Sequence, residues 1–588
     1  MTGTPPAPPG FSRPAVWAPG AGAVELVLED GATSMSAHDG GWWHAGAPLP
    51  AGARYRFALD GGEPLADPRA LRLPDGPEGP AEVVDLSAHA WSDGGWRGVE
   101  LSGAVIYELH VGTFTPEGTL DSAVGRLDHL VDLGVDLVEV MPLASFPGRH
   151  GWGYDGVGLF AVHEPYGGPY AFQRFVDACH ARGLGVCLDV VYNHLGPSGN
   201  RLPEFGPYFT DHYRTPWGSA VNLDRAGSDE VRRFIIDNAL GWLRDFHVDA
   251  LRLDAVHALY DERALPLLEE LSTAVDALAD ELGRPLSLIA ESDRNDPGTV
   301  TPRGAGGLGL TAQWADDVHH ALHVLLTGET QGYYGDFASS GALVKVLTGV
   351  FLHDGTWSSF RGRTHGRPVD RERTPGWRFV ASLQTHDQVG NRATGDRLSA
   401  TLDTGTLACG AALLLCAATT PMLFMGEEWG ASTPWQYFTD HPDPELAEAV
   451  RQGRRHEFAS HGWDREDVPD PQSPDTVHRS RLDWSEPTRE PHARLLAWYR
   501  NLIRLRRERP DLRDPRLDRV RVTSDDPART VLVQRGGHAV AVNVGDASAA
   551  LHLPAPGTEV LLAWEAPTTV DRGVLSLPPR SAAVLGPA

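Results

Sequence analysis

The sequence is poor in the features that mark extracellular, metal-bound or nucleic-acid-binding proteins. Its 588 residues include only four cysteines, which lie in apolar segments without zinc-type spacing, at Cys179, Cys187, Cys409 and Cys416. We therefore expect buried, unpaired thiols in a reducing compartment. The formal net charge of −27 argues against a nucleic-acid partner and against binding to anionic membrane surfaces.

Long apolar runs are also missing. The first residues lack the basic start and apolar core of a secretion signal, and no stretch reaches the roughly 20 apolar residues that span a bilayer. The nearest candidate, Leu407 to Thr420, is short and rich in alanine, which predicts a buried helix. Together these absences predict a soluble cytoplasmic protein with no membrane partner.

Three segments with different patterns of apolar and turn-forming residues predict three domains. Residues 1–95 alternate short apolar runs with Asp-Gly and Gly-Gly turns, which is typical of a β-sandwich. Residues 96–513 alternate strand-like and amphipathic helix-like stretches, the pattern of an α/β protein. Residues 514–588 return to short alternating strands and predict an antiparallel C-terminal β domain.

The middle segment contains eight candidate strands, which predict a (β/α)8 TIM barrel. They begin at Ala104, Val135, Gly185, Asp249, Leu286, Thr311, Arg378 and Pro421. Amphipathic stretches between them predict helices, such as 120–134, 170–183 and 229–247. A long polar insertion from Thr433 to about Glu490 precedes the last expected helix, 492–510.

Three of these strands end on a carboxylate: Asp254, Glu291 and Asp387. A buried acid is costly unless it is paired or has a function, and the C-terminal ends of barrel strands meet at the catalytic face. Three acids at such ends favour glycosidic-bond chemistry over structural ion pairs or helix caps.

Neighbouring residues suggest a role for each acid. Arg252 lies two residues before Asp254, so both side chains point to the same side of the strand, and the guanidinium would keep a nucleophilic carboxylate ionised. Burial would raise the pKa of Glu291 as a general acid requires, and Asp387 would favour a cationic transition state. A retaining glycosidase needs such a pair, with carboxyls about 5–5.5 Å apart.

Other polar and aromatic residues follow the same strand ends. Asp189 is placed to support Arg252, and His194 and His386 are placed to bond sugar hydroxyls, although a lone histidine is more often a satisfied core residue. Trp152 and Tyr154 follow the second barrel strand, where an aromatic face could stack on a pyranose ring.

The segments DVVYNH, ALRLDAVH, AESD and QTHD, in this order, resemble the α-amylase superfamily of glycoside hydrolases (family 13). The resemblance implies that Asp254 is the nucleophile, Glu291 the acid/base and Asp387 the transition-state stabiliser. It also implies that four side chains hold the attacked glucose: Tyr154, His194, Arg252 and His386.

Within the superfamily, stretches such as YFTDHYRTPWGSAVN, AESDRNDP and QWADDVHHALH resemble members that act on malto-oligosyltrehalose. Those enzymes cut the α-1,4 bond next to the terminal α,α-1,1-linked disaccharide and release trehalose, in sequence with a malto-oligosyltrehalose synthase and without a cofactor. This resemblance implies five residues on the trehalose side or its approach, for which a structural role is nearly as well supported: His257, Trp314, Asp316, Asp317 and Gln388.

Alternative functions remain open at this stage. A glucan branching or debranching enzyme shares the barrel, although branching enzymes usually carry a proline-containing version of DVVYNH. A plain α-amylase fits less well, because only about fifty residues separate the third and fourth strands, which leaves little room for a calcium-binding insertion. We therefore predict no essential metal, although Asn193 matches a superfamily calcium ligand. A catalytically inactive glucan-binding protein would need one of the three acids replaced.

Overall fold

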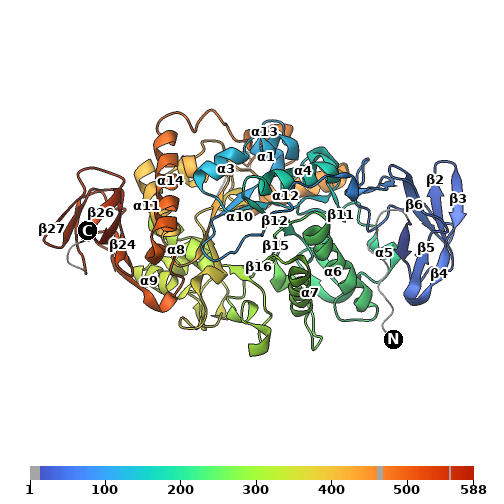
Figure 1. The fold of residues 1–588 in the computed structure, drawn as a ribbon, viewed down its shortest axis with the longest axis horizontal. Coiled ribbons are helices and arrows are strands. Elements are labelled where there is room, and N and C mark those ends of the chain that lie inside the picture. Colours follow the sequence, from blue (N-terminus) through green and yellow to red (C-terminus); the bar gives the residue numbers. More distant parts are fainter. Residues whose placement is uncertain (1–12, 460–467, 555–557, 588) are drawn as a thin grey trace.

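A closed barrel of eight parallel strands forms the centre of the molecule (Figure 1). The computed structural model describes residues 13–459, 468–554 and 558–587. In chain order the barrel strands are β8 (Ile106–Leu109), β9 (Leu137–Val140), β12 (Gly185–Val190), β15 (Ala250–Leu253), β16 (Ser287–Ala290), β17 (Ala312–Trp314), β20 (Phe379–Ser382) and β21 (Thr420–Phe424). Strand β21 pairs with β8 and closes the ring, so the predicted (β/α)8 fold is confirmed.

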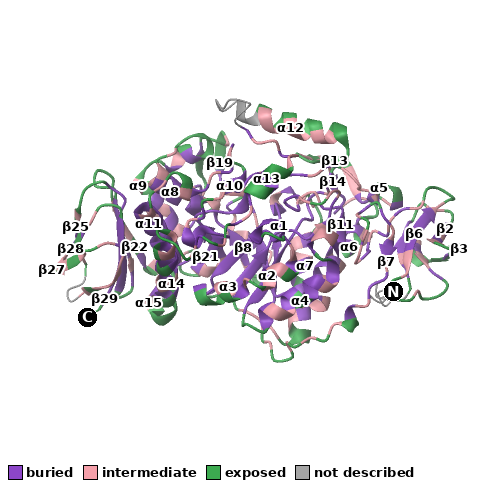
Figure 2. Cartoon of the chain, turned by 90° about the horizontal axis from the view of Figure 1, so that it is seen from above, coloured by how far each residue is buried: buried purple, intermediate pink, exposed green. Residues whose placement is uncertain are grey.

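The barrel strands are buried on both faces, which is why they read as nearly continuous apolar runs (Figure 2). Helices pack around them: α3 (Leu127–Leu133), α4 (Gly168–His180), α6 (Ser228–Asp245), α7 (Leu267–Leu282), α8 (Asp316–Thr327), α11 (Thr404–Leu415) and α14 (His492–Glu508). The buried helix expected near Leu407 is α11, and the last expected helix is α14.

The alternation of strands and helices departs from the prediction in two places. The expected helix over 120–134 is interrupted at Gly125, so α2 (Leu120–Val124) and α3 are separate. The connection between β16 and β17 carries only two short 3-10 turns, Pro297–Thr299 and Arg303–Ala305, in place of a helix. This connection contains two prolines and five glycines, residues that disfavour helix most strongly.

Antiparallel sheets flank the barrel on both sides (Figure 1). The N-terminal ones are β1-β5-β4, over Ala15–Trp17, Trp42–His44 and Ser36–His38, and β3-β2-β6-β7, over Gly31–Ser34, Val24–Leu28, Arg54–Leu59 and Ala81–Glu82. Trp42 of β5 is buried where this part meets the barrel, since its Nε1 donates to Glu230 of α6 (3.3 Å).

The C-terminal part consists of a five-stranded and a three-stranded sheet, as the prediction of an antiparallel β domain requires. The first contains β22 (Val520–Asp525), β23 (Thr530–Arg535), β24 (His538–Asn543), β29 (Ser581–Pro587) and β26 (Thr558–Ala563). The second contains β25 (Ala549–His552), β28 (Val574–Leu577) and β27 (Thr569–Asp571). The β22 edge packs against α9 (Ser340–Gly349) of the barrel.

All four cysteines are buried and free, so the prediction of unpaired thiols is confirmed. Across the described ranges, no helix combines the length and apolarity needed to cross a bilayer.

Candidate active site

The three predicted acids line a single cavity of about 370 Å³ at one end of the barrel. Asp254 follows β15, Glu291 follows β16, and Asp387 lies on the short helix α10 (His386–Gly390) after β20. Five further predicted residues line the same cavity: Trp152, Tyr154, His194, His257 and His386. The barrel thus brings together strand ends that lie more than 130 residues apart in the chain, as its topology requires.

Arg252 is the centre of this cluster. Its guanidinium is fully buried, with Nη1 donating to Asp189 Oδ2 (2.8 Å) and Asp254 Oδ1 (2.9 Å) and Nη2 donating to Glu291 Oε2 (2.9 Å). The ring of Trp314 lies 4.4 Å from the guanidinium carbon, close enough for a cation–π contact. One buried cation therefore links two of the three acids with the supporting Asp189.

The protonation of the two neighbouring acids differs from the expectation. Burial and the charge of Glu291 raise the pKa of Asp254 well above its ordinary value, and Arg252 offsets this only in part. Burial also acts to raise the pKa of Glu291, but Arg252 and the N–H of Ala255 outweigh it, so this pKa is lowered. The expectation of a raised pKa at Glu291 is therefore wrong for the ligand-free site.

The backbone after Asp254 contributes to this result. Ala255 adopts a left-handed conformation with φ 39°, which is rare for a residue with a side chain. This conformation turns its N–H toward Glu291 Oε2, at 2.8 Å. Such a conformation costs about 1–2 kcal/mol, a strain typical of functional sites.

His386 and Tyr154 form the next layer of the site. Their rings stack with centroids 5.1 Å apart, and His386 Nε2 lies 2.8 Å from Tyr154 Oη. Tyr154 Oη in turn donates to Asp189 Oδ2 at 2.6 Å. Asp189 therefore supports Tyr154 as well as Arg252, which the sequence did not predict.

Aromatic rings form the walls of the cavity. The buried Trp152 stacks on Trp435 (5.6 Å) and meets Tyr437 edge to face (5.1 Å). On another side, His194 stacks on Trp217 with centroids 4.3 Å apart and planes 7° from parallel. Trp217 lies at the turn between β13 (Phe209–Thr215) and β14 (Gly218–Val221) and is 49% exposed.

Besides Ala255, which directly follows Asp254, four lining residues were not predicted from the sequence: Asp155, Trp217, Tyr437 and Thr439. They lie in loops and in the insertion after β21, outside the strand ends that guided the prediction. Only the fold shows that this polar insertion returns to the cavity.

The remaining predicted residues lie around the cavity without lining it. Burial and the charges of Glu291 and Asp387 raise the pKa of Asp316 to about 7, so the Asp316 carboxyl interacts electrostatically with two of the three acids. Asp317 is buried elsewhere, and its Oδ2 accepts from Asn295 Nδ2 (2.9 Å) and the Leu352 N–H (2.7 Å).

Gln388 is turned toward a separate small void, and Trp314 lies beneath Arg252. Asp317, whose Oδ2 accepts from Asn295 and from the Leu352 N–H, has the contacts of a structural residue.

The part of the chain that the structure describes forms no metal site at these acids. Asn193 is 1% exposed, and neither atom of its side-chain amide has a hydrogen-bond partner in the described chain. Among the described residues, no group of three or more His, Cys, Asp or Glu side chains is arranged to hold a metal ion. The absence of an essential metal stays a prediction.

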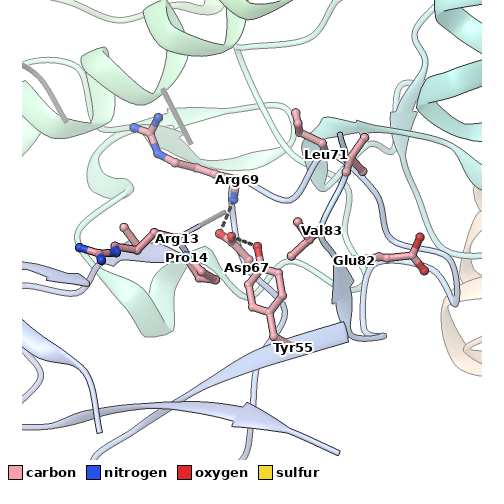
Figure 3. A pocket seen from close by; sticks show the side chains of 10 residues that line it. Arg13, Pro14, Tyr55, Asp67, Arg69, Leu71, Glu82 and Val83 are labelled. Carbon is pink, nitrogen blue, oxygen red and sulfur yellow. Dashed lines mark hydrogen bonds between the residues drawn. The ribbon is translucent and has the colours of Figure 1, made fainter. Parts of the chain in front are cut away.

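A second cavity lies where the N-terminal sheets meet the barrel, and its volume of about 30 Å³ is too small for a sugar. Figure 3 shows Asp67 of this cavity accepting from the Tyr55 hydroxyl (2.7 Å) and from the N–H of Arg69 (2.8 Å). Arg69 continues to Asp237 of α6 at 2.8 Å. These contacts join the N-terminal part to the barrel.

The fold and the site define a glycoside hydrolase of the α-amylase superfamily. The family model for the alpha-amylase catalytic domain matches residues 87–205, and a model for a domain of unknown function matches 515–584. The chain is 59% identical to malto-oligosyltrehalose trehalohydrolase of Arthrobacter ramosus, over 93% of this chain and 98% of that protein. It is 54% identical to the Rhizobium sp. (strain M-11) protein of the same name, over 98% of each.

A crystal structure of a presumed alpha amylase from Salmonella typhimurium superimposes with a TM-score of 0.89, at 39% identity over 98% of both chains. The chain belongs to the malto-oligosyltrehalose trehalohydrolase family.

Proposed function

We propose that this protein hydrolyses the α-1,4-glucosidic bond next to the terminal trehalose unit of malto-oligosyltrehalose, releasing trehalose and a malto-oligosaccharide with its α configuration retained. The observation that carries the proposal is the cavity in which Asp254, Glu291 and Asp387 meet around Arg252. High identity to trehalohydrolases over nearly the whole chain supports the substrate.

Asp254 is the proposed nucleophile and Glu291 the proposed acid/base. Glu291 protonates the leaving oxygen while Asp254 attacks the anomeric carbon, which gives a β-glucosyl-enzyme and frees trehalose. Glu291 then takes a proton from water, which displaces Asp254. Oε2 of Glu291 accepts from Arg252 and from the Ala255 N–H, so Oε1 is the atom left to carry the acid proton.

The remaining residues are proposed to bind the sugars. Asp387, beside His386, favours the cationic transition state through its negative charge. Tyr154 offers an aromatic face to the attacked glucose, and Trp217 offers a half-exposed ring for another sugar. Asp317 has no part in this proposal, because its oxygen is engaged by backbone and side-chain donors elsewhere.

The substrate's 1,1-linked end must come from an enzyme that isomerises the reducing end of a malto-oligosaccharide. We place the protein after such a malto-oligosyltrehalose synthase, in the cytoplasm. The four free, buried thiols support a reducing compartment.

The test compares malto-oligosyltrehalose with a malto-oligosaccharide of equal length and with amylopectin, with products separated by chromatography. The proposal expects trehalose release at a much higher kcat/KM than glucose or maltose release. Changed branching or α-1,6 cleavage without trehalose would establish a glucan-remodelling enzyme instead. No product from any substrate would support an inactive glucan-binding protein.

The assignment of the acids is tested with Asp254→Ala and Glu291→Gln. Both should abolish measurable turnover, since general acid–base catalysis alone contributes about 10²–10⁴-fold. Asp276→Asn is a matched control, because that carboxylate lies on α7 and is exposed. Near-normal rates in either active-site variant, with far-UV circular dichroism unchanged, would remove it from the mechanism.

A further inference from the structure

Glu108 is a buried acid beneath the cavity that has no place in the mechanism above. It lies on β8 and is 1% exposed. Its Oε2 accepts the backbone N–H of His386 at 2.9 Å, and its Oε1 lies 2.5 Å from Nδ1 of the same residue. One carboxylate therefore fixes both the start of α10 and the orientation of the imidazole ring.

The directions of the surrounding hydrogen bonds determine the protons on this ring. An ionised carboxylate only accepts, so Nδ1 donates to Glu108. Tyr154 Oη has a single proton, which it donates to Asp189, and Asp189 also accepts from the Arg252 guanidinium. Tyr154 Oη can then only accept at its 2.8 Å contact with His386 Nε2. Both ring nitrogens must carry a proton.

We infer that Glu108 is a positioning residue that holds His386 as a doubly protonated imidazolium and thereby presents Tyr154 and Asp387 to the sugar. The inference rests on the proposed function only for its effect on catalysis. Nε2 of this cation lies 3.6 Å from Asp387 Oδ1, close enough to favour the ionised form of that acid. The three acids of the cavity therefore lie near two positive groups, the Arg252 guanidinium and the His386 imidazolium.

Several titratable or charged groups surround His386. They are Glu108 from β8, Asp387 from its own helix, Arg252 from β15, Asp189 from β12, Glu139 from β9, Glu291 after β16, Tyr154, and His110 after β8. Burial and Arg252 disfavour the cation, but Glu108 and Asp387 outweigh them and raise the pKa of His386 to about 9. The positive charge is therefore present below about pH 9 and is lost as the pH rises through that value.

Glu108→Gln is the direct test, since it removes the charge and keeps the shape. An opposite charge at this distance shifts a pKa by about 1–3 units, so the pKa of His386 should fall by that amount. The alkaline limb of the pH profile of kcat/KM should therefore move to lower pH by the same amount.

Glu139→Gln is the matched control. Glu139 is the Cα partner of Glu108 in the pairing of β8 with β9 and is equally buried. Burial and the charge of Glu108 raise the pKa of Glu139 well above its ordinary value. Neither oxygen of its carboxyl group has a hydrogen-bond partner among the described residues, so the control removes no contact to His386. Its alkaline limb should remain that of the unchanged protein. An equal shift in both variants would show a general disturbance of the barrel and overturn the inference.

The protonation of His386 can be read without substrate by ¹⁵N NMR of the histidine-labelled full chain. The His386 signals are identified by their loss in His386→Gln. Both ring nitrogens protonated at pH 7, with a titration near pH 9 that falls in Glu108→Gln, is the expected result. A neutral His386 at pH 7 in the unchanged protein would overturn the inference even if Glu108→Gln does not fold. Because no sugar is present, this outcome is independent of whether trehalose is released.

Discussion

Replacing Arg252 by methionine tests how the active site is held together. Methionine has a similar length but no charge, and the guanidinium it removes is fully buried between three carboxylates. Asp189 and Asp254 are themselves 1% and 10% exposed, so water cannot take over the role of the lost cation.

The cost follows from this burial. Removing one partner of a buried ion pair costs about 3–5 kcal/mol, because it leaves an uncompensated charge or forces a carboxyl to take up a proton. A protonated Asp254 cannot attack, so restoring its charge adds about 4 kcal/mol to the barrier, on the order of a thousandfold in kcat/KM. Arg252 acts to lower the pKa of both Asp254 and Glu291, so the acid limb of the profile should also move to higher pH.

The assay measures kcat/KM for malto-oligosyltrehalose between pH 4.5 and 9, together with thermal melting. Arg232→Met is the matched control, since Arg232 is 2% exposed and ion-paired with Asp261 and Glu270 outside the cavity. It should lower the melting temperature without moving the acid limb. A rate for Arg252→Met within tenfold of the unchanged protein, with the acid limb in place, would refute the reasoning.

The stability of Arg252→Met should also depend on pH. The lowered pKa of Glu291 means that its charge stabilises the folded state above the unfolded pKa, and that this contribution is lost as the pH falls. The variant lacks this contribution from Arg252. As the pH falls toward 4, Glu291 takes up a proton in the unchanged protein too, and the stabilisation that Arg252 gives to its charge is lost there as well. The part of the difference in melting temperature that comes from Glu291 should therefore become smaller toward pH 4.

Three other perturbations separate binding, packing and metal dependence. Trp217→Ala removes a half-exposed ring and should raise KM about fivefold with kcat little changed, as steady-state kinetics would show; a fall in kcat alone would contradict a binding role. Gly390→Ala should lower activity more than tenfold, because its Cβ would lie 2.1 Å from the ring of Trp152. In the control Gly349→Ala the added Cβ meets open space, so the activity should not change. Chelation of divalent metals should leave the rate unchanged, and activity lost with EDTA and restored by calcium would show an essential metal.

The barrel could be predicted from the sequence because its strands have a distinctive composition. Ala250–Leu253 and Ser287–Ala290 are buried on both faces, and an acid directly after such a run stands out. Parallel closure then places those acids at one end of the barrel. The connection over 291–311 lacks the helix that a (β/α)8 pattern implies, because its prolines and glycines disfavour helix and leave only 3-10 turns.

The charge state of Glu291 could not be predicted in the same way. Its burial follows from its place after a strand, but the second donor to its carboxylate is the N–H of Ala255. The direction of that N–H depends on a left-handed backbone conformation, and an alanine in a sequence does not indicate such a conformation. Tyr437 and Thr439 were missed for a related reason, because the return of a long insertion to the cavity depends on tertiary packing.

The left-handed backbone at Ala255 also limits how this site can vary in a mutant library. The φ of 39° disfavours β-branched side chains at this position. Glycine would relieve the strain, but it would also free the peptide that carries the N–H to Glu291. Libraries that aim to change the substrate range should therefore keep position 255 fixed and place their diversity in the 209–221 hairpin and in the insertion after β21.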